Sequence, residues 1–360
     1  MTVRALTAVP GVAGSTRIDL LDETEPPEGH LEIDTILIGV CGTDHEIVAG
    51  DYGEAPEGSE RLVVGHEAVG RVTDPHDAAG FEAGDLVAPI VRRPDPVPCG
   101  ACAAGEWDMC ENGRYTEHGV RGAPGFARDR FSLDPAFAVP VPAALGELGV
   151  LVEPASVVAK AWEQIERIGA RAHWQPERVL VTGAGPIGLL AALMSRQRGF
   201  ETHVLDRVVD GPKPRLVTAL GADYHTGAVA DAGPTPDVVI ECTGAGRVVL
   251  DAIRHSSRAG IVCLTGLSSG ARAVEIDATA VNRRLVLEND VVFGTVNANR
   301  RHYNAAVAAF AAADPGWLDA LVTRRVPLGQ WAAAFDRHPD DVKVVLDLAT
   351  DHEWVATEAP

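Results

Sequence analysis

The sequence lacks the features that would place it in a membrane, secreted or fibrous class. No run of about 18 apolar residues occurs in its 360 residues, so we expect no transmembrane helix. The start, MTVRALTAVPGVAG, lacks the cationic segment and continuous apolar core of a secretion signal, which favours a cytoplasmic protein. Repeats of fixed period and low-complexity segments are also missing, which excludes solenoids and fibrous chains.

Lysine is scarce, and acidic residues are in excess. The chain has three lysines among 31 basic residues, against 51 acidic residues. Its formal net charge of −20 repels nucleic acid phosphates and anionic membrane surfaces, so neither is an expected partner. Hydrophobic residues make up 46% of the chain and charged residues 23%, which is typical of a folded globular protein.

The six cysteines do not form an obvious disulfide framework. Three lie between Cys99 and Cys110 and the others are scattered, in a long chain without a secretion signal. This distribution favours reduced thiols, some of which hold metal.

The length and the pattern of residues predict two domains. Residues 1 to about 90 contain short segments rich in β-branched residues and bounded by turn residues, which are typical of strands. From about residue 150, strand-like and helix-like segments alternate, which indicates a parallel sheet covered by helices. A final strand, VKVVLDL, suggests that residues near 300 to 350 return to the first domain.

A dinucleotide-binding motif opens this alternating region. In VLVTGAGPIGLL, three glycines with the spacing G-x-G-x-x-G follow a strand and begin a helix. The first permits a tight turn, the second lets the backbone approach a pyrophosphate, and the third allows close helix packing. The motif assigns cofactor binding to Gly183, Gly185, Pro186, Ile187 and Gly188.

An acidic residue follows at the distance expected for a ribose contact. Asp206 lies 18 residues past Gly188, where a carboxylate binds the adenosine ribose hydroxyls and repels a 2′-phosphate. We therefore favour NAD, although Arg207 allows NADP by pairing with that phosphate. Thr243 and Leu267 follow later strands and are further candidates for cofactor contacts, although ordinary loop positions describe them equally well.

The first domain offers a candidate catalytic zinc site. Cys41 in GVCGTDHE and the pair His66 and Glu67 in VVGHEAVG provide a thiolate, an imidazole and a carboxylate. Three protein ligands with one open position are typical of catalytic zinc. Taken singly, each residue has a structural alternative, since buried cysteines and core histidines are common.

The order of these motifs resembles the zinc-dependent medium-chain dehydrogenases over essentially the whole chain. The motifs are Cys41-Gly42-x-Asp44, then Gly65-His66-Glu67, three clustered cysteines, Glu153-Pro154, and the three glycines. The closest resemblance is to the glucose dehydrogenases known mainly from archaea. It is carried by CGTDHEIVAGDYG (41–53), LVVGHEAVG (62–70), VRRP (91–94), LVEP (151–154) and GTVNANRRHY (294–303).

The resemblance implies an α/β fold with two parts. A β-rich GroES-like catalytic domain would comprise residues 1–160 and be completed by about 300–360. A Rossmann domain, with a doubly wound parallel sheet, would bind NAD(P) and comprise residues 161–299. Relatives form homodimers or homotetramers, and we expect the same of this chain.

The resemblance also implies roles for individual residues. Cys41, His66 and Glu67 would hold the catalytic zinc, with Glu153 ligating directly or holding a metal-bound water. Thr43 would hydrogen-bond the reacting oxygen of the substrate. Glu117 and Asn297 match positions that face sugar or nicotinamide in the family, although a solvated acid and a turn asparagine are alternatives.

Two positions depart from the pattern of relatives. Many zinc alcohol dehydrogenases place a proton-relay histidine five residues after the first cysteine, where this chain has Glu46, with His45 one place earlier. Some family members place a polar sugar contact just before the paired arginines, where this chain has Val91. The proton route and the choice of sugar are therefore open.

The implied reaction is the zinc-dependent oxidation of the anomeric C1 hydroxyl of an aldose by NAD(P)+, which gives a lactone. A dehydrogenase of another polyol or cyclitol is an alternative, because the zinc and cofactor motifs would be the same. A non-catalytic NAD-binding relative is a further alternative, although the complete zinc ligand set argues against it.

The stretch PVPCGACAAGEWDMC carries a second, structural metal signal. Relatives hold a structural zinc with four cysteines spaced C-x₂-C-x₂-C-x₇-C, and Cys99, Cys102 and Cys110 match the last three. Proline stands at the first position and offers no ligand. Asp95 is our first choice for the fourth ligand, with Asp108 and Glu111 behind it, unless the site has decayed.

Overall fold

The computed structural model describes residues 2–22, 25–268 and 273–350, and within them the chain divides into two compact units. Unit 1 comprises the residues up to Glu153, residues 298–311 and the residues from Val322 onward; unit 2 comprises residues 154–297 and 312–321. Among the residues described, no helix is both long and apolar enough to span a bilayer.

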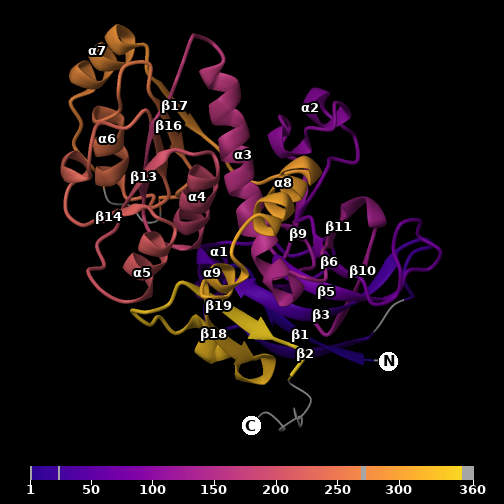
Figure 1. Ribbon diagram of the computed structural model, residues 1–360. Coiled ribbons are helices and arrows are strands. Elements are labelled where there is room, and N and C mark those ends of the chain that lie inside the picture. Colours follow the sequence, from indigo (N-terminus) through magenta and orange to yellow (C-terminus); the bar gives the residue numbers. More distant parts are fainter. Residues whose placement is uncertain (1, 23–24, 269–272, 351–360) are drawn as a thin grey trace. The chain divides into compact units, whose positions relative to one another are not determined.

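Unit 1 is built on β-strands. Its largest sheet has the order β11-β6-β5-β3-β19-β18, with β10 added on β3. Strand β19, from near the C-terminus, pairs antiparallel with β3, so the end of the chain completes the sheet begun by its start (Figure 1). The main elements are β1 (Thr2–Ala8), β2 (Arg17–Asp22), β3 (Leu31–Val40), α1 (Gly42–Ala49), β4 (Leu62–Val63), β5 (Glu67–Asp74), β6 (Leu86–Pro89), β10 (Arg130–Leu133), β11 (Ala138–Val141), α8 (Arg300–Ala311), β18 (Val322–Pro327) and β19 (Lys343–Asp347).

The core of unit 1 follows from the alternation of apolar residues along these strands. Leu31, Ile33 and Val72 are buried in one hydrophobic cluster, together with the aromatic rings of Phe126 and Phe131. A smaller part of the unit carries the clustered cysteines and has little regular structure. It contains β7 (Arg92–Arg93), α2 (Gly100–Ala103), η1 (Trp107–Met109), β8 (Thr116–His118) and β9 (Gly122–Ala123). Of the remaining short helices, η2 (Pro135–Phe137) directly precedes β11, η3 (Gly146–Leu151) packs against β3, β5 and β6, and η5 (Leu328–Phe335) lies beside β18 and β19.

Unit 2 is a six-stranded parallel sheet with the order β14-β13-β12-β15-β16-β17. The order reverses between β12 and β15, which is the switch point where doubly wound sheets bind dinucleotides. The elements are α3 (Val152–Gly169), β12 (Arg178–Thr182), α4 (Pro186–Gln197), β13 (Glu201–Leu205), α5 (Pro212–Ala219), β14 (Asp223–His225), η4 (Val229–Asp231), β15 (Val238–Glu241), α6 (Gly246–Arg254), β16 (Ile261–Leu264), α7 (Ala278–Glu288), β17 (Val291–Gly294) and α9 (Pro315–Asp319).

The division of the chain differs in two places from the expected boundaries. The first unit ends at Glu153, near the start of α3, and the helix itself belongs to unit 2. Residues 312–321, which we expected in the first domain, group with unit 2. The reason is that Trp317 of α9 is buried and its indole Nε1 donates a hydrogen bond to the carbonyl of Leu216 in α5 at 2.9 Å.

Candidate functional site

The candidate catalytic ligands of unit 1 gather around His66. The ring nitrogen Nε2 of His66 lies 3.2 Å from Cys41 Sγ. His66, Glu67 and Glu153 place one ligand atom each within 4.8 Å of one another, and so do Cys41, Asp44 and His66. The structure therefore brings the four predicted ligands Cys41, His66, Glu67 and Glu153 into two groups that share His66.

Local backbone geometry explains how these side chains are presented. Cys41 is the N-cap of α1, directly after β3, and His66 precedes β5, which pairs with β3. Gly65 has a φ of +84°, and a Cβ there would lie 2.8 Å from Ile38 and 2.9 Å from Ala127. Glycine is therefore required at the position before His66.

Asp44 holds the imidazole of His66, and sequence reasoning did not assign it this role. Its Oδ2 accepts the Cys41 backbone N–H at 2.9 Å, and its Oδ1 lies 3.4 Å from His66 Nδ1. An aspartate three residues after a helix N-cap is a capping pattern, so the sequence did contain a signal for it. Since Nδ1 faces a carboxylate, Nε2 is the nitrogen presented on the side of Cys41.

Lys343 was also missed, and it holds Glu67. Its ammonium pairs with Glu67 Oε2 and donates to the Val40 carbonyl at 3.1 Å, although the side chain is almost fully buried. Gly39 lies opposite Glu67 in the β3–β5 pair, and a Cβ there would lie 2.1 Å from Glu67 Oε2. The missing side chain of Gly39 thus makes room for the pair.

Burial and charge together shift the pKa values of this cluster. Burial opposes the charge on His66, but Asp44 and Cys41 outweigh it and raise the pKa of His66 well above its ordinary value. Burial, with the Asp44 carboxylate beside it, raises the pKa of the Cys41 thiol. Burial likewise raises the pKa of Glu153 to about 7. A bound metal ion would favour the deprotonated forms of Cys41, His66 and Glu153, which are the forms that act as ligands.

Other predicted residues of unit 1 have clear positions. Thr43 lies in the first turn of α1, two residues after Cys41. His45 packs edge-on against Phe335 with ring centroids 5.3 Å apart, and burial lowers its pKa. Glu117 is buried, and its Oε1 accepts hydrogen bonds from Arg92 Nε and Nη2 at 3.1 and 3.0 Å.

Three thiols of unit 1 form a separate cluster. Cys99, Cys102 and Cys110 place their sulfurs within 4.8 Å of one another, and the Glu111 N–H donates to Cys99 Sγ at 3.5 Å. This contact and the Cys102 N–H lower the pKa of the Cys99 thiol to about 6. Among the described residues, neither Asp95, Asp108 nor Glu111 joins the three thiols in a ligand group. Asp95 instead accepts the Val97 N–H at 2.9 Å.

The glycine motif of unit 2 occupies the turn between β12 and α4. Gly183 has a φ of +90°, which the tight turn requires, and a Cβ on Gly188 would lie 1.7 Å from the Gly183 carbonyl. A Cβ on Gly185 would meet nothing within 4 Å. Gly183 therefore forms the tight turn, Gly188 allows the helix to pack closely, and Gly185 leaves the backbone open on its outer side. Pro186 and Ile187 form the first turn of α4 behind it.

Asp206 is already engaged in hydrogen bonds within this turn. Its Oδ2 accepts the Ala184 N–H at 2.7 Å and its Oδ1 accepts the Val208 N–H at 3.0 Å. The ammonium of Lys213 lies 3.9 Å from Oδ2, and Arg207 is exposed. One positive charge, that of Lys213, therefore lies beside the carboxylate that we expected to repel a 2′-phosphate.

Glu241 organises the neighbouring loop after β15, and the sequence analysis did not assign it. Its fully buried carboxylate accepts the N–H groups of Thr243 at 2.8 Å and Gly244 at 3.1 Å. Leu267 lies exposed on the loop after β16, and Asn297 has a left-handed backbone with φ of +61°. Thr243 and Leu267 thus follow strands of the parallel sheet at its carboxyl edge.

Comparison with known proteins covers nearly the whole chain. A family model described as "Glucose dehydrogenase C-terminus" matches residues 146–348, and one described as "Alcohol dehydrogenase GroES-like domain" matches residues 27–143. A glucose 1-dehydrogenase of Methanocella arvoryzae is 37% identical over 96% of this chain and 99% of its own length. One from Thermoproteus tenax is 38% identical over 97% of this chain and 100% of its own.

The chain also matches a solved structure over nearly its whole length. The glucose dehydrogenase of Haloferax mediterranei, in complex with NADP, Zn and gluconolactone, matches with a TM-score of 0.87 and 32% sequence identity. The match covers 96% of this chain and 99% of that one.

Proposed function

This chain belongs to the glucose dehydrogenase family of zinc-dependent medium-chain dehydrogenases, and on that premise we propose that it oxidises the C1 hydroxyl of a glucose-like aldose with NAD(P)+. The family and the α/β fold class, with a GroES-like part and a Rossmann part, are thereby confirmed as predicted from the sequence. The products are the lactone and the reduced cofactor.

The observation that carries this proposal is the ligand cluster around His66. It combines a thiol, an imidazole and two carboxylates, which is a donor set that suits zinc. The cluster also has the outer carboxylate that zinc-binding histidines typically have, since Asp44 faces His66 Nδ1. The residues present therefore fit a zinc ion, held by Cys41, His66, and Glu67 or Glu153.

The chemistry divides between the bound groups and the chain. Zinc supplies a Lewis acid that lowers the pKa of a substrate hydroxyl, and the nicotinamide supplies the hydride acceptor. Asp44 fixes the ring orientation of His66, and Lys343 holds Glu67. The hydroxyl oxygen of Thr43 would accept a hydrogen bond from the reacting hydroxyl of the substrate and so orient its oxygen.

The bonds of the reaction balance without a further reactant. The C1–H bond breaks and its electron pair leaves as hydride to the nicotinamide, while the hydroxyl loses its proton to solvent. The C1–O bond becomes a carbonyl, and the ring oxygen makes that product a lactone.

Recognition of the sugar or the nicotinamide is assigned to two polar residues. Glu117 and Asn297 would bind the remaining hydroxyls or the nicotinamide, as in the family resemblance. Glu117 is held by Arg92, whose guanidinium stacks 3.7 Å from the ring centroid of Tyr115, so its carboxylate has a defined orientation. The side chain of Val91 is buried and offers no polar group, which supports a sugar pocket that differs from relatives with a polar residue there.

Cofactor binding is assigned to the switch point of the unit 2 sheet. Gly183, Gly185 and Gly188 would receive the pyrophosphate at the N-terminus of α4. Asp206 supports NAD, whereas Lys213 and Arg207 beside it support NADP, which the Haloferax relative binds. We therefore propose that both cofactors are used, with NAD as the expected preference.

The three thiols of unit 1 would hold a second, structural zinc. Three sulfurs within 4.8 Å of one another fit a tetrahedral ion, and the N–H contact to Cys99 stabilises a thiolate. Such a site has protein ligands on all sides and no role in hydride transfer.

The assembly and compartment complete the proposal. Strand β17 lies at the edge of the parallel sheet, and Val286 and Leu287 of α7, which precedes it in the sequence, are 66% and 60% exposed; both features support a homodimer or homotetramer. All six cysteines are free thiols, which supports a reducing compartment such as the cytoplasm.

A substrate panel tests the proposal directly. Purified protein with measured zinc content is given aldoses, polyols and cyclitols with NAD or NADP, and reduced cofactor is followed by absorbance. Activity on glucose or a related aldose is expected. Activity confined to cyclitols or other polyols would contradict the aldose assignment. A protein that binds the cofactor but holds no zinc and oxidises no alcohol would be a non-catalytic relative.

A further inference from the structure

The fourth ligand of the three-cysteine site has no assigned residue. Cys99, Cys102 and Cys110 supply three thiols, but Pro96 stands where relatives have a cysteine. A structural zinc requires four ligands. We infer that the side-chain oxygen of Asn112 is the fourth ligand and that Asp95 positions it, an inference that rests on the proposed structural zinc.

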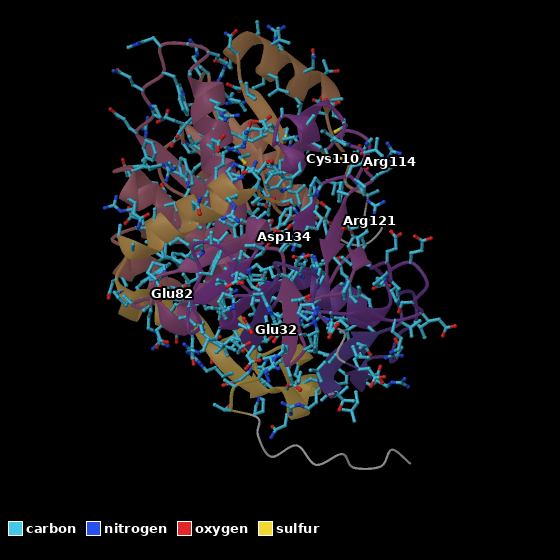
Figure 2. All side chains as sticks on the ribbon, turned by 90° about the vertical axis from the view of Figure 1, so that its right-hand side faces the viewer. Glu32, Glu82, Cys110, Arg114, Arg121 and Asp134 are labelled. Carbon is cyan, nitrogen blue, oxygen red and sulfur yellow. The ribbon has the colours of Figure 1, made fainter. Side chains whose placement is uncertain are left out.

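Asn112 lies close to the thiols in space. Its Oδ1 is 3.1 Å from Cys110 Sγ. For zinc–sulfur and zinc–oxygen bonds of about 2.3 and 2.1 Å at a tetrahedral angle, the sulfur and oxygen lie about 3.6 Å apart. The observed spacing is therefore close to that of two ligands on one ion. In the sequence, Asn112 lies between Cys110 and Arg114, two residues that are labelled in Figure 2.

Two neighbours, Asp95 and Arg114, fix which end of the Asn112 amide faces the thiols. The Nδ2 group of Asn112 donates to the Asp95 carboxylate, and its Oδ1 accepts the Arg114 N–H at 3.1 Å. A flipped amide would set two donors against each other at Arg114 and two acceptors at Asp95. An amide oxygen has two lone pairs, so one can accept from Arg114 while the other is directed to a metal.

Asp95, our earlier first choice for the ligand, has a different role in this geometry. Its Oδ1 accepts the Val97 N–H at 2.9 Å, and its Oδ2 binds Asn112 and lies 3.4 Å from Arg114 Nε. Both carboxylate oxygens are thus engaged away from the thiols. Asp95 holds Asn112 as Asp44 holds His66: in each case a buried carboxylate orients the residue that contacts the metal.

The other two candidates are engaged elsewhere. Asp108 Oδ1 accepts the side-chain N–H of Asn299 at 2.6 Å. Glu111 is exposed and contacts Cys99 through its backbone N–H. Of the described residues around the cluster, Asn112 places a side-chain oxygen within hydrogen-bond distance of one of its thiols, that of Cys110.

Zinc stoichiometry and affinity test the inference on the full-length protein. Asn112→Ala is expected to lower the bound zinc from two ions to one per chain under competition with a chelator, while the other site stays loaded. Asp95→Asn removes only the positioning carboxylate and is expected to weaken zinc about tenfold, as outer-shell changes do. Glu111→Gln, a neighbouring exposed change, is the matched control and is expected to retain both ions.

Asn112→Cys provides a test that depends on a gain of absorbance and not on a loss of zinc. With cobalt in place of zinc, the thiolate-to-metal absorbance scales with the number of thiolates, so the variant is expected to gain about a third and to bind metal more tightly. Absence of that gain would overturn the inference. Zinc retained in Asn112→Ala but lost in Asp95→Asn would identify Asp95 as the ligand, and zinc retained in both would identify water.

The failure of the inference is distinguishable from failure of the wider proposals. If the wild-type protein binds a single zinc with no thiolate absorbance from this cluster, the structural site itself is absent. Oxidation of an aldose would be unaffected by that result, because the cluster around His66 does not include these thiols.

Discussion

At the scale of single residues, Gly39 shows how a missing side chain can shape a metal site. A methyl group there would lie 2.1 Å from Glu67 Oε2 and 2.8 Å from Lys343 Cε. Gly39→Ala is therefore expected to separate Glu67 from Lys343, to lower kcat/KM at least tenfold, and to cost about 1–3 kcal/mol of stability, as overpacking does. Steady-state kinetics and urea unfolding measure both effects.

Gly42 provides the matched control for that change. It lies three residues away, and a Cβ there meets nothing within 4 Å. Gly42→Ala is expected to leave kcat/KM within about twofold and stability within about 1 kcal/mol. Equal behaviour of the two variants would contradict the role given to Gly39.

His118 is expected to make stability depend on pH. Burial, with the positive charge of Arg93, lowers its pKa to about 3, and its Nδ1 donates to the Pro124 carbonyl at 2.7 Å. Below its unfolded pKa of about 6.5, the unfolded chain binds a proton that the folded protein does not. Stability from this group is therefore present above pH 6.5 and is lost as the pH falls, by about 2 kcal/mol at pH 5.

His118→Gln isolates this effect. Glutamine can still donate a hydrogen bond but does not titrate, so the variant is expected to lose about 2 kcal/mol less than the wild type between pH 7.5 and pH 5. Urea unfolding at the two pH values measures the difference. The same loss in both proteins would show that His118 titrates normally in the fold.

The candidate metal ligands stand out in the sequence, but the residues that hold them in place do not. Cys41, His66 and Glu67 have donor chemistry that stands out in a sequence. Lys343 lies 276 positions after Glu67, and its role depends on the pairing of β19 with β3, which a single sequence does not reveal. Asp44 and Asn112 lie near the ligands in sequence, but the direction of a side-chain oxygen is decided by its hydrogen-bond partners.

At the scale of elements, the turn between β12 and α4 assigns separate tasks to its glycines. Gly185→Ala introduces a methyl group that meets no protein atom within 4 Å, so stability should change by less than about 0.5 kcal/mol. Because the backbone there is expected to touch the pyrophosphate, cofactor affinity should fall at least tenfold. Calorimetric titration with NAD and NADP measures it.

Gly188→Ala gives the opposite pattern. Its methyl group would lie 1.7 Å from the Gly183 carbonyl, so α4 must shift and the variant is expected to lose several kcal/mol of stability. A Gly185→Ala protein with wild-type cofactor affinity would contradict the assigned cofactor site, whatever Gly188→Ala does.

Elements with strong periodicity were predictable and short irregular ones were not. The alternation of strands and helices from residue 150 indicated the parallel sheet, because buried parallel strands are nearly continuous apolar runs. The placement of α9 was wrong because its five residues carry little pattern, and the burial of Trp317 against unit 2 decides where it lies.

At the scale of the whole molecule, the exposed apolar residues of α7 predict self-association. Light scattering during size-exclusion chromatography is expected to give two or four times the chain mass of 37.9 kDa. Charge at Val286 and Leu287, as in Val286→Glu with Leu287→Lys, should lower that mass. Val209→Glu is the control, since Val209 is 79% exposed and lies outside α7, in the segment between β13 and α5. A monomeric wild type would contradict the prediction.

Identification of the sugar product is the most direct test of the proposed oxidation of an aldose at C1. Zinc-loaded protein is incubated with glucose and NAD or NADP, and the sugar product is identified by NMR as reduced cofactor accumulates. Gluconolactone, or the acid formed by its hydrolysis, is expected in equal amount to the reduced cofactor. Reduced cofactor with a product oxidised at another carbon, or no turnover of any aldose beside turnover of a cyclitol, would contradict it.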